Sequence, residues 1–202
     1  MTRTIRALLA ALALTITVTA PGSRAAETPS DPEAQTPFGL YLTAEEAGAM
    51  KAAQGDQVLL VDVREPIEIM FTGVTDMVDV NVPFMLVNPA KWHPEKPVFL
   101  MEPNPDFAAG IEAALAERGL GKDAPIILMC RSGGDRGAPS ARALHGKGFE
   151  AVYVVVDGFE GVTSKDDPKA PWRNVNGWKN SSWPWSYSLD REKLDTRPAP
   201  FD

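Results

Sequence analysis

The chain contains few of the residues that build metal sites and disulfide frameworks. Its 202 residues include one cysteine, Cys130, and two histidines. A lone cysteine cannot form an intramolecular disulfide, and this set leaves little material for a metal site, so none is predicted. The cysteine is then either buried and inert or chemically used. Its place after an apolar run and before two consecutive glycines favours use.

Long apolar runs are also absent outside the N-terminus. Arg3 and Arg6 precede an apolar stretch over residues 7–20, and small residues lead to a cleavage site after Ala25. This pattern predicts a signal peptide at residues 1–25, and so an exported protein, periplasmic or secreted. The alternative is an uncleaved anchor, but the run is shorter than the ~20 residues that a membrane span needs. No other stretch approaches that length, so no membrane association is expected after cleavage.

Positive charge is in deficit. The chain has 20 Lys and Arg residues against 27 Asp and Glu, a formal net charge of −7. Cleavage after Ala25 would remove three arginines and no acids, which lowers the charge to −10. Such an acidic protein is a poor candidate for binding nucleic acid or an anionic membrane.

The remaining chain divides by composition into three parts. Residues 26–37 are rich in Pro, Ala, Thr and acids, which predicts a disordered linker. Residues 38–163 alternate β-branched apolar runs with helical patterns, which predicts an α/β domain with a mostly parallel sheet. Residues 164–202 hold four of the five tryptophans and several prolines. We interpret this extension as packing on the domain, with a partner surface as the alternative.

Two helix starts and one long connection stand out inside the domain. Thr43 and Glu46 have capping-box spacing, and Asn104 before Pro105 is typical of a helix N-cap followed by proline at the first position. Residues 84–103 carry four prolines and show no clear periodicity, so they are predicted to be a long connection. His93 lies in this connection and is a weak candidate for a base.

The domain is organised around the loop that contains Cys130. Four apolar residues precede it, a glycine-rich loop bounded by Arg131 and Arg136 follows, and a helical pattern comes next. Strand, loop and helix in this order build a cradle of backbone N–H groups that favours an anion. We therefore expect Cys130 to be a nucleophile whose thiolate is favoured. Asp62 and Arg64 end a neighbouring buried run and are expected to orient adjacent loops through an ion pair.

These stretches together resemble a single-domain rhodanese. The resemblance rests on residues 60–65 (Leu-Val-Asp-Val-Arg-Glu), 81–83, 126–136, 148–149 and 154–161 (Val-Val-Val-Asp-Gly-Phe-Glu-Gly). It implies a rhodanese-like α/β fold, with a central parallel sheet of about five strands flanked by helices on both faces.

The resemblance also implies a function. Cys130 would be the catalytic nucleophile that carries sulfur as a persulfide, from a small sulfur-containing anion such as thiosulfate to a thiol or cyanide-like acceptor. The loop residues would bind the anion, and the arginines would lower the thiol pKa. Asp62 and Arg64 would support the site, and no cofactor is needed. The anion-binding loop consists of Arg131, Ser132, Gly133, Gly134, Asp135 and Arg136.

The loop departs from the family pattern in length. Four residues commonly separate the cysteine from the next arginine in sulfurtransferases, whereas five do here. The longer spacing is found in related dual-specificity phosphatases and arsenate reductases, which makes an oxyanion enzyme the alternative. Asp135 counts against it, because its carboxylate would repel an oxyanion unless it acts as an acid or points outward. Met129 also counts against it, because it replaces a histidine of those phosphatases. Gly133 and Gly134 could instead absorb the insertion as a bulge. A non-catalytic binding module is the third possibility.

Overall fold

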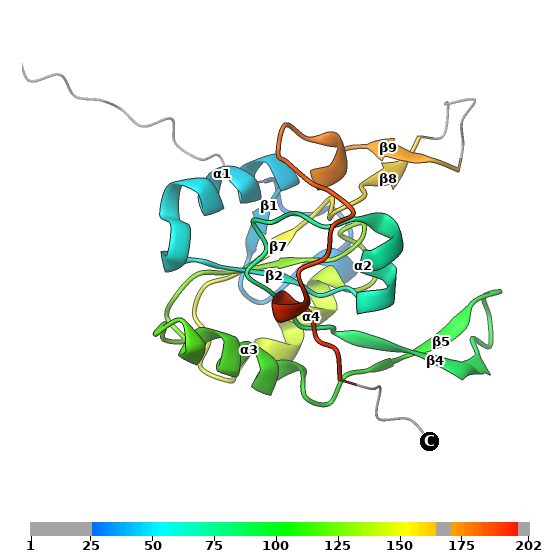
Figure 1. The fold of residues 1–202 in the computed structure, drawn as a ribbon, viewed down its shortest axis with the longest axis horizontal. Coiled ribbons are helices and arrows are strands. Elements are labelled where there is room, and N and C mark those ends of the chain that lie inside the picture. The colour runs from blue at the N-terminus through cyan, green and yellow to red at the C-terminus, as the bar shows by residue number, and fades with distance from the viewer. Residues whose placement is uncertain (1–25, 165–170, 198–202) are drawn as a thin grey trace, which may run out of the picture.

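The computed structural model describes residues 26–164 and 171–197 (Figure 1). The predicted signal peptide lies outside the described residues. Within these ranges no helix combines the length and the apolar character that crossing a membrane requires.

A five-stranded parallel sheet forms the centre of the fold. Its order is β1-β7-β6-β2-β3, and every neighbouring pair is parallel. Parallel strands covered on both faces are built from continuous apolar runs, and β2 and β6 are buried along their whole length. The predicted fold class is therefore confirmed. The strands are β1 Leu40–Leu42, β2 Leu59–Asp62, β3 Val80–Asn81, β6 Ile126–Met129 and β7 Val152–Val155.

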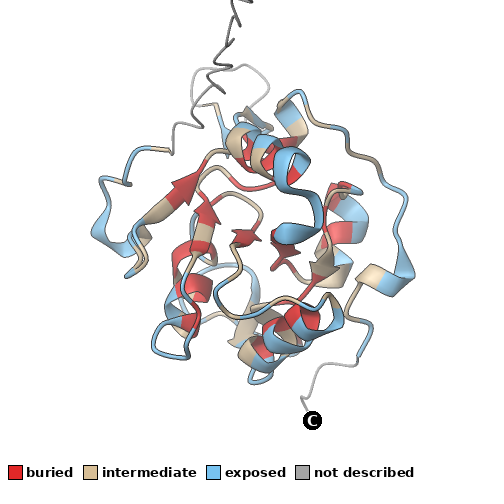
Figure 2. Ribbon diagram, turned by 90° about the vertical axis from the view of Figure 1, so that its left-hand side faces the viewer, coloured by how far each residue is buried: buried red, intermediate tan, exposed pale blue. Residues whose placement is uncertain are grey.

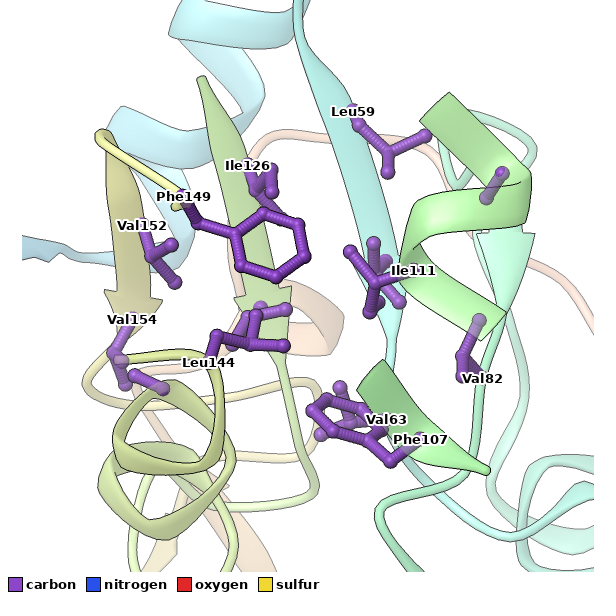
Figure 3. Packing of buried hydrophobic residues seen from close by; sticks show 14 of the residues in the cluster. Leu59, Val63, Val82, Phe107, Ile111, Ile126, Leu144, Phe149, Val152 and Val154 are labelled. Carbon is purple, nitrogen blue, oxygen red and sulfur yellow. The ribbon is translucent and has the colours of Figure 1, made fainter. Parts of the chain in front are cut away.

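Helices cover both faces of this sheet. On one face α3 (Phe107–Glu117) and α4 (Gly137–Leu144) pack against alternate strand residues such as Leu59, Ile126 and Val154 (Figure 3). On the other face lie α1 (Ala44–Gln54) and the side chain of Trp178, packed against the intervening strand residues. Figure 2 shows the buried strands between helices whose outer faces are exposed. A short helix α2 (Pro66–Thr72) follows β2.

The two predicted helix starts differ in outcome. Thr43 and Glu46 form the expected capping box, with a 3.2 Å bond from the Glu46 N–H to the Thr43 hydroxyl. Helix α3 instead begins at Phe107, and its N-cap residue makes no side-chain bond. The Asn104 side chain donates to the Pro83 carbonyl oxygen at 2.8 Å and accepts the Asp106 N–H at 3.0 Å, so it holds both the preceding loop and the turn that leads into the helix.

The connection over residues 84–103 was predicted without regular structure, and this is wrong. It forms an antiparallel hairpin of β4 (Met85–Trp92) and β5 (Phe99–Pro103), which projects from the domain (Figure 1). Mostly exposed strands lack the alternating pattern that marks a half-buried strand. His93 accepts backbone N–H bonds from Glu95 and Lys96 at 3.1 Å, so its ring stabilises the hairpin turn.

The segment 26–37 also differs from the prediction of a disordered linker. It contains the 3-10 helix η1 (Pro32–Ala34), and Ala26 donates to the Tyr41 carbonyl oxygen at 3.1 Å. The Arg142 guanidinium on α4 donates to the carbonyl oxygens of Glu33 and Gln35 at 2.9 and 2.8 Å. These partners are distant in sequence, so the composition of the segment does not show them.

The C-terminal extension lies against the domain. After β8 (Val162–Thr163) it continues through β9 (Arg173–Val175), η3 (Trp178–Asn180) and η4 (Arg191–Lys193). Trp178 is fully buried, whereas Trp172 is 69% exposed. Lys193 and Asp195 bond to residues beside and within β3, so the extension runs along this edge of the sheet.

Candidate active site

Cys130 lies at the carboxyl end of β6, between the neighbouring strands β2 and β7. Its side chain is buried, and Sγ accepts a hydrogen bond from the Gly133 N–H at 3.2 Å. The loop therefore turns back over the sulfur before α4 begins at Gly137. This is the cradle expected from the order of strand, loop and helix.

The loop after β7 holds the cradle in shape. Phe159 and Glu160 donate backbone N–H bonds to the carbonyl oxygens of Cys130 and Arg131, both at 2.8 Å. Because these two carbonyl oxygens point toward the loop after β7, the N–H groups that follow them in the cysteine loop can face the sulfur. The close approach requires glycine: a Cβ on Gly133, whose φ is +75°, would lie 1.7 Å from the Val156 carbonyl oxygen.

Each loop arginine is paired with a glutamate. Arg131 Nε lies 2.6 Å from Glu160 Oε2. Arg136 contacts both carboxylate oxygens of Glu68 on α2, at 2.5 and 2.8 Å. Burial disfavours the charged form of Glu68, but the hydrogen bonds and charge of Arg136 outweigh it and lower the pKa of that carboxyl. The two arginines that were expected to stabilise the Cys130 thiolate are thus each paired with a carboxylate.

The expectation that the Cys130 thiolate is favoured is wrong, although Arg136 does lower the thiol pKa as predicted. Burial raises the pKa of Cys130 above its ordinary value. The charge of Arg136 and the N–H groups of Ser132 and Gly133 act in the opposite sense without overcoming it, and Glu68 adds to the rise. The protonated thiol is therefore favoured in the resting protein.

The second half of the cysteine loop forms an exposed turn. Gly137 donates its N–H to the Gly134 carbonyl oxygen at 3.2 Å, which closes a turn over residues 134–137. Gly134 and Asp135 are both exposed. Asp135 borders a surface groove that it shares with residues 31–37 and Arg142. This turn therefore lies on the solvent side of the loop, whereas Gly133 is buried beside the sulfur.

Asp62 and Arg64 form a fully buried ion pair. The Arg64 guanidinium also donates to the Thr72 hydroxyl at 2.6 Å and to the Gly73 carbonyl oxygen at 3.0 Å, which fixes the end of α2. It lies 4.1 Å from the centre of the Phe159 ring. The pair therefore positions α2 and the loop after β7 and does not contact the sulfur.

Sequence reasoning missed both glutamates of the site. Glu68 lies in the first turn of the helix that follows β2, and β2 neighbours β6. Because adjacent parallel strands end at the same edge of a sheet, this position could have been inferred once the strand order was known. Glu160 lies within residues 154–161, which contribute to the family resemblance, but no role was predicted for it. Among residues 26–164 and 171–197, no cluster of three or more acidic, histidine or cysteine side chains could hold a metal ion.

Comparisons with known proteins agree with this geometry. Residues 43–165 match the family model described as a rhodanese-like domain. One solved structure that matches is "Crystal structure of Rv0390 from M. tuberculosis". It has a TM-score of 0.53 and 27% sequence identity, and the match covers 73% of this chain and 97% of that chain. No curated protein matches the chain.

Proposed function

We propose, from the premise that this chain belongs to the rhodanese family, that it is a sulfurtransferase which carries sulfur as a persulfide on Cys130. The family match supports the sulfurtransferase superfamily, and the specific activity is our inference. The observation that carries it is the position of Sγ beneath the loop, 3.2 Å from the Gly133 nitrogen. A group attached to Sγ would lie close to the N–H groups of Ser132 and Gly133, which would stabilise negative charge on it.

The reaction begins with loss of the thiol proton to solvent. The thiolate attacks the outer sulfur of a thiosulfate-like donor, an S–S bond forms at Cys130, and the donor S–S bond breaks as sulfite leaves with the electron pair. The new sulfur extends about 2 Å beyond Sγ toward the loop. A thiophilic acceptor such as cyanide or a thiolate then attacks this outer sulfur, and the Cys130 thiolate is released.

One feature weighs against an oxyanion enzyme. Arg136 is held by both oxygens of Glu68, so its guanidinium is already paired. The exposed position of Asp135 removes the objection that its carboxylate would repel an oxyanion. The raised thiol pKa is the one observation that favours a non-catalytic binding module, because a thiol is a weaker nucleophile than a thiolate.

One experiment distinguishes these functions. Purified protein is mixed with thiosulfate, and its mass is measured before and after addition of cyanide. The proposal expects a gain of one sulfur atom, its loss on adding cyanide, formation of thiocyanate, and none of these in Cys130→Ser. Absence of both the adduct and turnover would refute it, and hydrolysis of an aryl phosphate by the same preparation would favour the oxyanion enzyme.

We also propose that the protein is exported, on the basis of the N-terminal pattern of basic, apolar and small residues. The expected mature chain begins at Ala26. Expression with the native N-terminus, followed by fractionation and N-terminal sequencing, tests this, and a chain that retains Met1 in the cytosolic fraction would contradict it.

A further inference from the structure

The C-terminal extension reaches the candidate active site through η3. The backbone N–H groups of Trp178 and Lys179 donate to the carbonyl oxygens of Gly158 and Phe159, at 2.9 and 2.8 Å. The buried Trp178 side chain anchors this turn in the core. The Phe159 N–H in turn donates to the Cys130 carbonyl oxygen. Backbone hydrogen bonds therefore link the extension to the loop after β7, and that loop to the cysteine loop.

Lys179 is held on this turn by contacts on two sides. Its ammonium lies 3.4 Å from Glu160 Oε1, while the other carboxylate oxygen of Glu160 contacts Arg131. On the other side the ammonium faces the rings of Trp185 and Tyr187, 4.7 and 5.5 Å from their centres. Such ring contacts favour a cation. The side chains of Lys179 and Glu160 are only 19% and 11% exposed, so their positions are constrained.

The charge balance of the loop depends on this lysine. Arg136 is matched by Glu68 and Arg131 by Glu160, while Asp135 adds an unmatched negative charge in the exposed turn. Without Lys179 these groups carry one negative charge in excess. With it they are balanced, and the Arg131 side of the loop, where two cations share one carboxylate, is positive.

We propose that Lys179 is a specificity-determining residue: by sharing Glu160 with Arg131, it leaves positive charge on the loop that follows Cys130, which favours anionic sulfur donors. This deepens the proposed sulfurtransferase function and rests on it for the identity of the donor. The lysine acts through Glu160 and Arg131, so it is a positioning residue and is not required to touch the substrate. It belongs to the extension, beyond the residues 43–165 that match the family.

The charge at Cys130 can be measured without any sulfur transfer. Iodoacetate, an anion, and iodoacetamide, its neutral analogue, alkylate the same thiolate, so the ratio of their rates cancels the thiol pKa. In Lys179→Gln we expect this ratio to fall about two- to fivefold at low ionic strength, and the difference to shrink in high salt. Lys179→Arg should restore the ratio. Glu160→Gln should raise the ratio of the iodoacetate rate to the iodoacetamide rate. This change is opposite in sign to that of Lys179→Gln, so a general loss of structure would not explain both.

Lys193→Gln is the matched control, because it removes the same charge from the same extension. Lys193 binds the carbonyl oxygens of Asp76 and Val78, before the amino end of β3, whereas Cys130 lies at the carboxyl end of the sheet. An unchanged ratio in Lys179→Gln, or an equal fall in Lys193→Gln, would overturn the proposal.

Steady-state kinetics supply the second measurement. For Lys179→Gln we expect KM for thiosulfate to rise by a similar factor while kcat changes little. An unchanged KM in an active protein would overturn the role in donor binding. If the wild-type protein forms no persulfide at all, the proposed function fails, whereas the alkylation ratio still reports on Lys179.

Discussion

Substitution of Glu68 by glutamine tests how the site controls its cysteine. In the native protein this carboxylate neutralises Arg136 through two contacts and also raises the pKa of Cys130 by its own charge. Glutamine keeps the shape of the side chain but removes the charge. The positive charge of Arg136 then acts on the sulfur without an opposing carboxylate.

The expected result is a lower thiol pKa. At an effective dielectric constant of about 20, removal of one nearby unit charge is worth on the order of 1 kcal/mol. We therefore expect the pKa of Cys130 to be lower in Glu68→Gln than in the wild type, because the charge of Glu68 raises it and the charge of Arg136 lowers it. The pH dependence of the iodoacetamide reaction rate measures this pKa directly.

The control is Glu112→Gln. Glu112 lies on α3 and forms an exposed ion pair with Lys122, so this substitution removes a carboxylate elsewhere in the protein. Its thiol pKa should equal that of the wild type. If the midpoint in Glu68→Gln stays unchanged or rises while the control behaves as expected, the electrostatic role of Glu68 is refuted.

The same substitution has a stability consequence with a defined sign. Loss of the largely buried contacts to Arg136 should lower the free energy of unfolding by about 1–3 kcal/mol at neutral pH. Because the pKa of Glu68 is lowered in the folded state, its contribution is present above about pH 4.3 and is lost as the pH falls through the folded pKa. Urea unfolding of both proteins should therefore show a difference that shrinks in acid.

Three further predictions concern the sulfur, the loop and the extension. Because the pKa of Cys130 is raised in the folded state, the wild type should lose stability relative to Cys130→Ala as the pH rises above about 8.5, which urea unfolding at several pH values measures; parallel curves would contradict the burial effect. Gly133→Ala should cost more than about 3 kcal/mol or prevent folding, whereas Gly146→Ala, at the same φ of +75° but with open space around it, should cost only about 1–2 kcal/mol. Trp178→Ala should cost about 3–5 kcal/mol and the exposed Trp172→Ala less than about 0.5 kcal/mol, and equal melting temperatures would refute the packing of the extension.

The family, the sheet and the position of Cys130 at the end of a strand could all be predicted from local pattern. Continuous β-branched runs such as residues 126–129 and 152–155 suffice to indicate strands buried on both faces, because nothing polar interrupts them. The capping box at Thr43 needs only residues three positions apart. Cys130 was identified because a strand, a glycine-rich loop and a helix follow one another without a gap.

Local pattern was insufficient for the exposed or weakly patterned segments. The β4–β5 hairpin projects from the domain and so lacks an apolar alternation, and the segment 26–37 is held by an arginine on α4 that lies more than 100 residues away. In both segments the backbone is satisfied by partners that no short window of sequence contains.

The sequence by itself determined that the protein has a parallel α/β sheet, one candidate nucleophile and a glycine-rich loop to receive an anion. Tertiary structure alone decided the charge state of that site. Glu68 arrives from α2, Glu160 from the loop after β7 and Lys179 from the extension, and each alters the balance around two arginines that the sequence shows without partners. The physical reason is that hydrophobic periodicity is local and repeats along the chain, whereas the pKa of a buried thiol depends on burial and on charges that only folding brings within a few ångströms.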